Sequence, residues 1–154
     1  MSASTKLSTA VKAVCFLAVS HPEPKSSIEI AKCINTNASK LRKILSMLVK
    51  NDIVESWQGT SGGFILKKSP SKLHVQEIYC AIEDRKAFHL DVSNNTGIKP
   101  KENGSGIDIT SRLNEYFLDL FADIQVDIEN KMRKITIESV LQSINKNNYL
   151  KQLK

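Results

Sequence analysis

The segment from Ala38 to Lys50, ASKLRKILSMLVK, combines residue types that suit a negatively charged partner. In a helix, successive residues turn by about 100°, which would separate an apolar side from a polar side. The apolar side holds Ala38, Leu41, Ile44, Leu45 and Leu48, and the polar side holds Thr36, Ser39, Lys43, Ser46 and Lys50, flanked by Lys40 and Arg42. An ordinary solvated face mixes both signs of charge for i,i+4 pairing. This polar side has four cations and no acid, so we predict that it binds a polyanion.

A second stretch, QGTSGGFIL over residues 58–66, places three of the chain's six glycines within five positions. Such crowding fits either a phosphate-binding loop before a helix or the tip of a β-hairpin. The phosphate loop is disfavoured because no Gly-Lys-Ser/Thr is present and the next residues have strand character. We therefore predict a hairpin in which Gly62 and Gly63 permit a tight turn and let the backbone approach a phosphate or a groove. Lys67 and Lys68 would add positive charge at its base.

No set of side chains predicts catalysis or metal binding. The three histidines lack metal-ligand spacing, and no nucleophile motif accompanies them. Cys15, Cys33 and Cys80 are odd in number and scattered, which argues against disulfides and against a C-x-x-C metal site. Cys33 follows Lys32, so it is either a redox-sensitive thiol or a small packing residue. Trp57 is interpreted as an anchor of the hairpin rather than as a base-stacking platform. We expect no enzymatic activity.

Charge is distributed unevenly between the two halves of the chain. Residues 1–72 contain eleven Lys/Arg and four Asp/Glu, a net +7, whereas residues 73–154 contain eleven against twelve, a net −1. A basic half commonly faces a polyanion, although positive charge also serves solubility. No apolar run reaches the roughly 18 residues that span a membrane. The first run, AVKAVCFLAV, contains Lys12 and has no small-residue cleavage site after it. We expect a cytoplasmic protein with no membrane segment.

The first half of the sequence predicts three helices followed by a hairpin. Apolar residues recur at helical spacing over residues 7–20, and Ser26 with Glu29 forms a capping-box pattern for a helix over about 27–34. The turn residues Asn35 to Asn37 then precede the cationic helix, which makes a helix-turn-helix. Strands are predicted in NDIVESW and GFILKK, and a further helix over about 75–83. This order is that of a winged helix-turn-helix domain over residues 1–83.

The second half predicts a loop, a long helix and a closing helix. Residues 84–109, rich in Asn, Gly, Lys and Ser, form the predicted loop, which is either an effector pocket or a linker. Residues 110–144 form a long amphipathic helix and a short closing helix, and residues 145–154 a polar tail that frays. Because so long a helix has no evident partner in its own chain, we predict that it pairs with its copy in a second subunit. The alternative is that it folds back on the basic domain. The predicted dimer interface consists of Leu113, Phe117, Leu120, Ile124, Ile128 and Met132.

Residues 1–83, and more loosely 110–144, resemble the Rrf-type (type two) family of bacterial winged-helix transcription regulators. The likeness rests on the segment IAKCINTNASKLRKILSMLVKNDIVESWQGTSGGFILKK, with Ile-Ala before the helix-turn-helix and a G-x-x-G-G wing after it. Ala38 stands where one subgroup has a proline. The resemblance implies a mainly helical fold with a small β-hairpin wing and a long dimerisation helix. It also implies DNA binding, usually to repress nearby promoters.

The resemblance assigns roles to individual residues. The major groove would be met by Thr36, Asn37, Ser39, Lys40, Arg42, Lys43 and Ser46, and the minor groove or backbone by Gln58, Thr60, Ser61, Gly62 and Gly63. Within these sets, Asn37 is suited to reading adenine, and Arg42 and Lys43 to contacting guanine or phosphate. Many family members have arginine where this chain has Gln58, so the affinity that an arginine gains in a narrow minor groove is not expected here.

The best-known relatives bind an iron–sulfur cluster through three cysteines in the loop before the dimerisation helix. Residues 84–109 of this chain contain no cysteine, and His89, Asp91 and Glu102 cannot replace three thiolates. We therefore expect no cofactor. The sequence predicts a homodimeric, sequence-specific regulator, a repressor, that binds double-stranded DNA. The alternative is a winged-helix module that docks an acidic protein partner.

Overall fold

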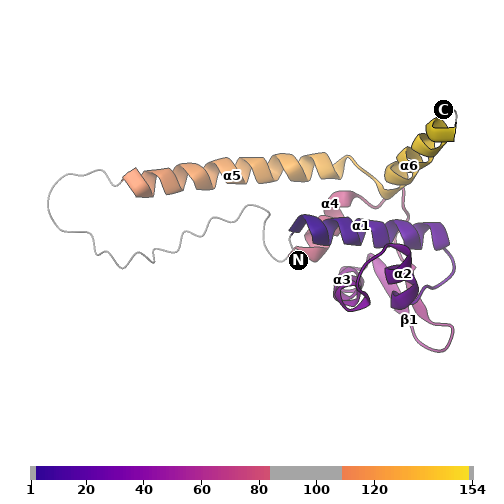
Figure 1. Ribbon diagram of the computed structural model, residues 1–154. Helices are drawn as coiled ribbons and strands as arrows, with labels where there is room; N and C mark the ends of the chain where they lie inside the picture. The colour runs from indigo at the N-terminus through magenta and orange to yellow at the C-terminus, as the bar shows by residue number, and fades with distance from the viewer. Residues whose placement is uncertain (1–2, 84–108, 153–154) are drawn as a thin grey trace.

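The computed structural model describes residues 3–83 and 109–152, so the predicted loop lies outside the described residues except for its last residue (Figure 1). The elements follow one another as α1 (Ala3–Ser20), α2 (Ser27–Cys33), α3 (Ala38–Lys50), β1 (Val54–Trp57), β2 (Gly63–Leu66), α4 (Val75–Ile82), α5 (Ile109–Arg133) and α6 (Ile137–Gln152). The predicted fold class, a mainly helical winged helix-turn-helix with a β-hairpin and a long additional helix, is confirmed.

Short-range hydrogen bonds determine where α2 and α3 begin. The Ser26 hydroxyl accepts from the Glu29 N–H at 3.2 Å, and the Glu29 carboxylate accepts from the Ser26 N–H at 2.8 Å, which confirms the predicted capping box. The chain then turns at Asn35, whose φ of 52° lies in the left-handed region that asparagine tolerates. The side-chain oxygen of Asn37 caps α3. The start of α3 is therefore encoded within a dozen residues.

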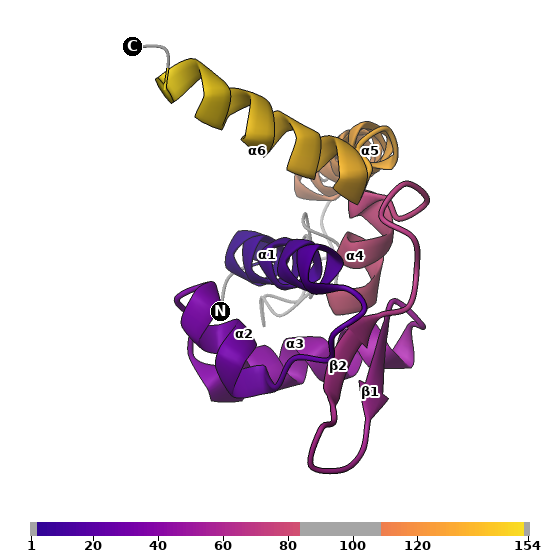
Figure 2. The same ribbon diagram turned by 90° about the vertical axis from the view of Figure 1, so that its right-hand side faces the viewer.

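The hydrophobic core lies between α1, α3 and α4, and Figure 2 shows α1 above α3 and beside α4. The buried side chains from these helices include Ala10, Val14, Leu17, Leu41, Ile44, Leu45, Leu48, Ile78 and Ile82. Four of the five apolar positions predicted for α3 are thus buried, and Ala38 is partly buried. Burying each Leu or Ile contributes about 1.5–3 kcal/mol. This core fixes the rotation of α3 and directs its polar side to solvent.

The wing is a two-stranded antiparallel hairpin in which Val54 pairs with Leu66 and Trp57 with Gly63. The segment before α2 adds a bridge to it, because Lys25 and Phe64 exchange backbone hydrogen bonds. A Cβ added at Gly63 would lie 2.7 Å from the carbonyl of Lys25, so only glycine permits this approach. At the tip, Gly59 has φ +106°. The hairpin is therefore held against the helix-turn-helix.

The helices α5 and α6 follow the winged-helix domain, and Ile137 at the start of α6 is buried in its core. The carboxyl-terminal part of α5 packs on α4, and its amino-terminal part projects beyond the domain (Figure 1). The Val75 N–H donates to the Ile135 carbonyl and the Ile137 N–H to the Leu73 carbonyl, each at 2.9 Å, which fixes the junction between α5 and α6. The helix α6 runs to Gln152, farther than the predicted short closing helix, because no Gly or Pro interrupts this stretch.

Candidate nucleic-acid interface

The polar side of α3 forms a continuous exposed surface. Ser39, Lys43 and Ser46 lie along its middle, Lys40 and Arg42 flank them, and all five are exposed. Directly behind, the side chains of Leu41 and Ile44 are buried, so the helix cannot rotate to hide its cations. No Asp or Glu occurs in α3 itself. The face carries positive charge and hydroxyl donors, which together suit phosphate oxygens and base edges.

Asn37 has a role that the sequence did not predict. Its Oδ1 accepts hydrogen bonds from the backbone N–H groups of Ser39 at 2.9 Å and Lys40 at 3.2 Å. Bidentate reading of adenine needs the same oxygen as an acceptor together with the amide NH₂. The cap therefore competes with the predicted adenine contact. Thr36, beside it, is half-buried, and its N–H donates to the Ala31 carbonyl at 2.9 Å.

Arg42 is positioned by the preceding helix. Its Nε donates to the hydroxyl of Ser27 at 3.3 Å, a contact between α3 and the first residue of α2. The guanidinium group has further donors that this bond leaves available. Ser27 is thus a residue of the interface that sequence reasoning missed, although it begins the predicted second helix. The contact restricts the orientation of the guanidinium group at one flank of the cationic face.

The wing tip presents polar side chains, and its glycines serve the fold. Gln58, Thr60 and Ser61 are exposed, whereas Gly62 and Gly63 are half-buried. A Cβ at Gly62 would lie 2.3 Å from the Trp57 carbonyl oxygen. The close approaches at Gly62 and Gly63 are made within the chain, and contact of their backbone with a phosphate or a groove stays a prediction. The side chains that the tip presents are those of the three polar residues.

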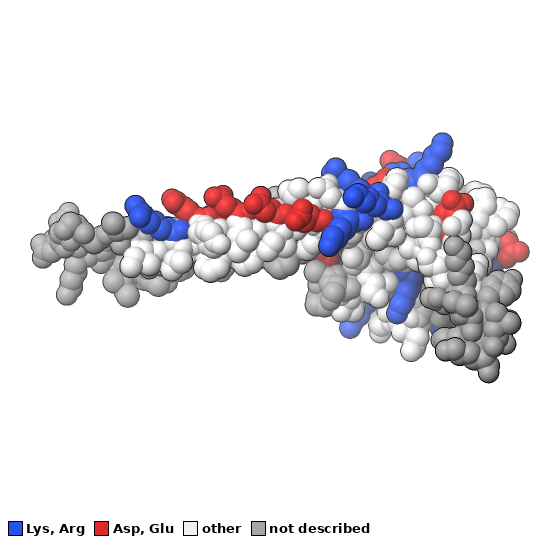
Figure 3. Space-filling view, turned by 90° about the horizontal axis from the view of Figure 1, so that it is seen from above, with Lys and Arg blue, Asp and Glu red and all other residues white. Residues whose placement is uncertain are grey.

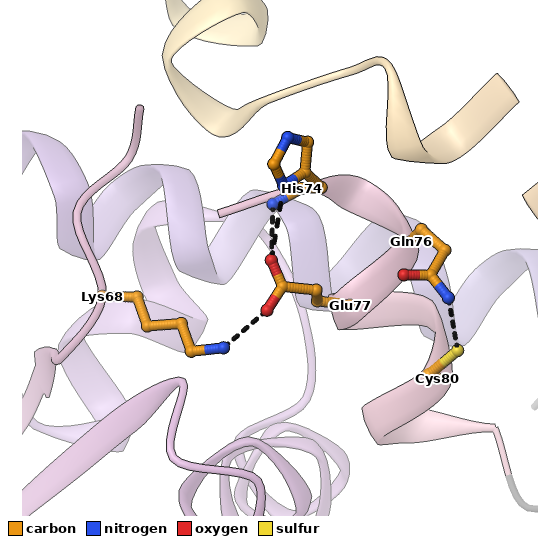
Figure 4. Close-up of polar contacts among 5 residues, drawn as sticks. All are labelled: Lys68, His74, Gln76, Glu77 and Cys80. Carbon is orange, nitrogen blue, oxygen red and sulfur yellow. Dashed lines mark hydrogen bonds and ion pairs between the residues drawn. The ribbon is translucent and has the colours of Figure 1, made fainter. Parts of the chain in front are cut away.

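The two lysines at the base of the wing are paired with acids. Lys67 Nζ lies 2.8 Å from Asp52 Oδ1, and this hydrogen bond raises the pKa of Lys67 and lowers the pKa of Asp52. Lys68 forms an ion pair with Glu77 of α4, which also accepts from the His74 N–H (Figure 4). The predicted charge at the base is thus largely compensated, and the uncompensated cations of the interface lie on α3.

A shallow hollow of about 400 Å³ separates α3 from the wing. It is lined by Arg42, Ser46 and Val49 of α3 and by Trp57, Gln58 and Phe64 of the hairpin. Half of the Trp57 side chain (50 %) is exposed, and its predicted role as a hairpin anchor stays a prediction. A composition-based interpretation could not detect this exposure, since the register that pairs Trp57 with Gly63 leaves no side chain opposite the indole.

The cysteines differ in exposure. Cys33, the last residue of α2, is exposed, so the predicted alternative of a packing residue is not supported. Cys15 packs against the core, and burial raises the pKa of its thiol. Cys80 on α4 is exposed, and its sulfur lies 3.2 Å from the amide nitrogen of Gln76 (Figure 4). Partial burial and the nearby Glu129 raise the pKa of Cys80. Neither raised pKa favours a reactive thiolate.

In the two described ranges, no three His, Cys, Asp or Glu side chains gather in a way that holds a metal ion. The three cysteines come from three separate helices, and the sequence between α4 and α5 contains none. Thiolates are the usual ligands of iron–sulfur clusters. The segment between α4 and α5 therefore supplies no thiolate.

The predicted dimer seam on α5 is only partly covered by its own chain. Leu113, Phe117 and Leu120 are 48 %, 38 % and 36 % exposed, and Ile124 and Ile128 are partly buried. Met132 is 9 % exposed and is covered within the single chain, so it contributes little to any further contact. Asp and Glu follow one edge of α5, and the neighbouring side is free of charge (Figure 3). The acidic row consists of Glu115, Asp119, Asp123 and Asp127.

Across the described residues, no helix is both long and apolar enough to span a membrane. The family model for Rrf2, described as an "Iron-dependent Transcriptional regulator", matches residues 3–143. The HTH-type transcriptional regulator YwnA of Bacillus subtilis, as that protein is named, is 29 % identical over 126 residues, covering 82 % of this chain and 88 % of YwnA.

Solved structures show the same fold at low sequence identity. A protein named as a transcriptional regulator from Lactobacillus plantarum is 20 % identical, with a TM-score of 0.73 over 96 % of this chain and 94 % of that one. IscR of T. potens is 21 % identical, with a TM-score of 0.63 over 91 % of this chain and 85 % of its own. CymR, the global cysteine regulator of Bacillus subtilis, is 20 % identical, with a TM-score of 0.62 over 90 % of this chain and 95 % of that one.

Proposed function

Because this chain belongs to the Rrf2 family of transcriptional regulators, we propose that it acts as a homodimeric, sequence-specific repressor of transcription in the bacterial cytoplasm. Each subunit would place α3 in the major groove of double-stranded DNA and the wing on the adjacent minor groove or backbone. The single observation that carries this proposal is the exposed polar side of α3, where Lys40, Arg42 and Lys43 are fixed outward by a buried apolar side.

The surroundings of α3 support a contact with DNA rather than with solvent alone. An exposed surface helix usually mixes acids with bases, but α3 contains only bases among its charged residues. The wing is held beside α3 by the bridge from Lys25, so the two elements present a single surface. Protein–DNA interfaces combine backbone contacts, which position the protein, with base contacts, which give specificity. The polar residues at the wing tip and the cations on α3 are suited to these two kinds of contact.

The exposed apolar residues of α5 support dimerisation through that helix. Leu113, Phe117 and Leu120 lie where α5 extends past the winged domain, and the acidic row occupies a different edge. Two copies related by a twofold axis would bury these residues against each other. The two recognition helices would then meet half-sites about one helical turn, roughly 34 Å, apart.

The donor set supports regulation without an iron–sulfur cluster. We include this in the proposal although the family description refers to iron, because the chain lacks cysteines between α4 and α5. The inducing signal would then act on residues of the protein and not on an iron–sulfur cluster. The exposed Cys33, next to the recognition unit, is the thiol that we propose for any redox response. Identical oxidant responses of DNA affinity in the wild type and in Cys33→Ser would exclude it.

The decisive experiment measures DNA binding as a function of salt. A duplex is selected from random 40-base-pair DNA on the wild-type protein, and its affinity is titrated by fluorescence anisotropy. If the dimer neutralises about 6–10 phosphates, affinity should fall by roughly 10³–10⁵ between about 50 and 200 mM salt. A flat response would contradict the proposal. Weak, sequence-indifferent binding together with capture of an acidic protein would instead support a protein-docking module.

The surface assignment is tested with matched pairs of substitutions. Arg42→Ala with Lys43→Ala should abolish specific binding and leave the dimer intact, because both cations lie on the exposed side of α3. Lys131→Ala with Lys134→Ala removes the same charge at the carboxyl-terminal end of α5 and just after it, and should leave affinity within about twofold, apart from long-range electrostatics. Equal losses in the two double variants would show that net charge, not α3, provides the binding.

A further inference from the structure

The hollow between α3 and the wing has an aromatic wall that the proposed function does not explain. Trp57 ends β1, is half exposed, and faces the hollow with Arg42 and Ser46 of the recognition helix. Tryptophan is a costly side chain to leave in water, because it can bury more apolar area than almost any other residue. Its exposure at the junction of two DNA-facing elements therefore points to a partner that covers it.

The fold keeps the indole uncovered. In the hairpin register Trp57 lies opposite Gly63, which has no side chain to pack on the ring. Gly63 cannot be larger, because a Cβ there would collide with the Lys25 backbone. The bridge that holds the wing against the helix-turn-helix thus also leaves one face of Trp57 open. Phe64, the next residue of β2, is half-buried and also lines the hollow.

The lining has the chemistry of a nucleotide site. The guanidinium group of Arg42 suits a phosphate, the hydroxyl of Ser46 and the amide of Gln58 suit phosphate or base edges, and the indole offers a flat apolar face. No Asp or Glu belongs to the residues that line the hollow. An acidic peptide would use the cations but would gain nothing specific from a flat ring, whereas a nucleotide uses both.

We propose that one DNA strand passes through this hollow, and that Trp57 packs against a deoxyribose or base of that strand while Arg42 contacts the neighbouring phosphate. The inference rests on the proposed function and adds a residue to it. A strand that leaves the major groove beside α3 must cross to the minor groove beside the wing, and the hollow lies between these two elements. Trp57 thus makes an uncharged contact with the DNA between the contacts made by α3 and those made by the wing.

The chain contains a single tryptophan, so its fluorescence reports this site alone. The probe is the duplex selected from random DNA on the wild-type protein. Binding should change the emission of Trp57 and reduce its quenching by acrylamide. Trp57→Ala should weaken affinity by roughly 10- to 100-fold, the range expected for loss of one aromatic stacking contact. Trp57→Phe should recover most of the loss, and Val19→Ala, an exposed apolar residue outside the hollow, should have no effect.

Salt dependence separates a contact from a structural role. Because the indole carries no charge, Trp57→Ala should leave the slope of log affinity against log salt unchanged, whereas Arg42→Ala should reduce it by about one. A slope that falls in Trp57→Ala would indicate a displaced wing and overturn the proposal. If Trp57→Ala does not fold by circular dichroism, the emission and quenching of the wild type decide the question.

Failure of this inference is distinguishable from failure of the proposed function. If the wild type binds the selected duplex without a change in Trp57 emission or quenching, and Trp57→Ala binds with the same affinity, the contact is excluded. The DNA-binding function would still stand. A wild-type protein that recovers no duplex from the random pool and shows no salt-dependent binding overturns both.

Discussion

Lys25 and Phe64 exchange two backbone hydrogen bonds, from the Lys25 N–H to the Phe64 carbonyl at 3.0 Å and from the Phe64 N–H to the Lys25 carbonyl at 2.8 Å. This bridge connects the residue just before the capping box of α2 to the second strand of the wing. It makes the helix-turn-helix and the hairpin one structural unit. Together with the shared core, this main-chain bridge restrains the relative position of α3 and the wing, on which simultaneous contact with two grooves depends.

The bridge predicts that Gly63→Ala destabilises the protein and displaces the wing. The added Cβ would lie 2.7 Å from the Lys25 carbonyl, so the strand must move. We expect a loss of about 1–3 kcal/mol in the free energy of unfolding, measured by chemical denaturation, and weaker DNA binding. Ser61→Ala, an exposed position of the same hairpin, is the control and should change stability by less than about 0.5 kcal/mol. Equal stabilities would show that the bridge does not restrain the wing.

The contact between Arg42 and Ser27 predicts that lysine cannot fully replace Arg42 in DNA binding. Arg42→Lys keeps the charge but loses the Nε donor that is 3.3 Å from the Ser27 hydroxyl. DNA affinity should fall about fivefold, the equivalent of one hydrogen bond near 1 kcal/mol. A double-mutant cycle tests the cause, because in a Ser27→Ala background the same change should cost little. Additive effects would mean that Ser27 does not orient the guanidinium group.

The exposed seam of α5 predicts that charge placed there separates the subunits. Leu113→Glu with Phe117→Glu should raise the dimer dissociation constant more than about 30-fold, since each side chain would be buried between two copies of α5. Analytical ultracentrifugation measures the constant. Asp119→Asn with Asp123→Asn, on the acidic edge of the same helix, should leave it nearly unchanged. A wild-type chain that sediments as a monomer at all concentrations would refute dimerisation through α5.

The contacts of Glu77 predict a loss of stability in acid. Partial burial alone would raise the pKa of Glu77, but hydrogen bonds from Lys68 and from the His74 N–H outweigh it and hold the pKa below its ordinary value of 4.5. A lowered pKa in the folded state means that the carboxylate stabilises the fold above about pH 4.5 and that this contribution disappears as the pH falls through the lowered pKa. Figure 4 shows the three residues together at the start of α4.

The test compares Glu77→Gln with Glu77→Ala in thermal melts between about pH 3 and 7. Glutamine can still accept the capping hydrogen bond at this position, so Glu77→Gln should lose only the pH-dependent part of the stabilisation. Glu77→Ala should lose both parts and be less stable across the whole range, by about 1 kcal/mol near neutral pH. A Glu77→Gln protein with the same acid dependence as the wild type would assign the transition to other carboxylates.

Local sequence patterns were sufficient for the elements and for the face of α3. The capping box at Ser26 and Glu29, the turn at Asn35 and the apolar periodicity of residues 38–50 each act over a few residues, so the sequence alone encodes them. The same periodicity identified Arg42 and Lys43 as outward-facing. The polar tail shows the limit of this approach, since its composition predicted fraying where the chain continues as α6.

The tertiary structure decided what surrounds each of these residues, because that depends on segments far apart in the chain. The sequence shows a glycine at position 63. It does not show that the backbone of Lys25, which lies before α2, requires glycine there. The sequence placed Trp57 next to the wing, and only the hairpin register showed that the ring is open to a partner. Likewise, α5 was predicted to be amphipathic, and packing on α4 determined that Met132 is covered while Leu113 stays exposed. Periodicity fixes which side of an element is apolar, whereas burial depends on what the folded chain brings against it.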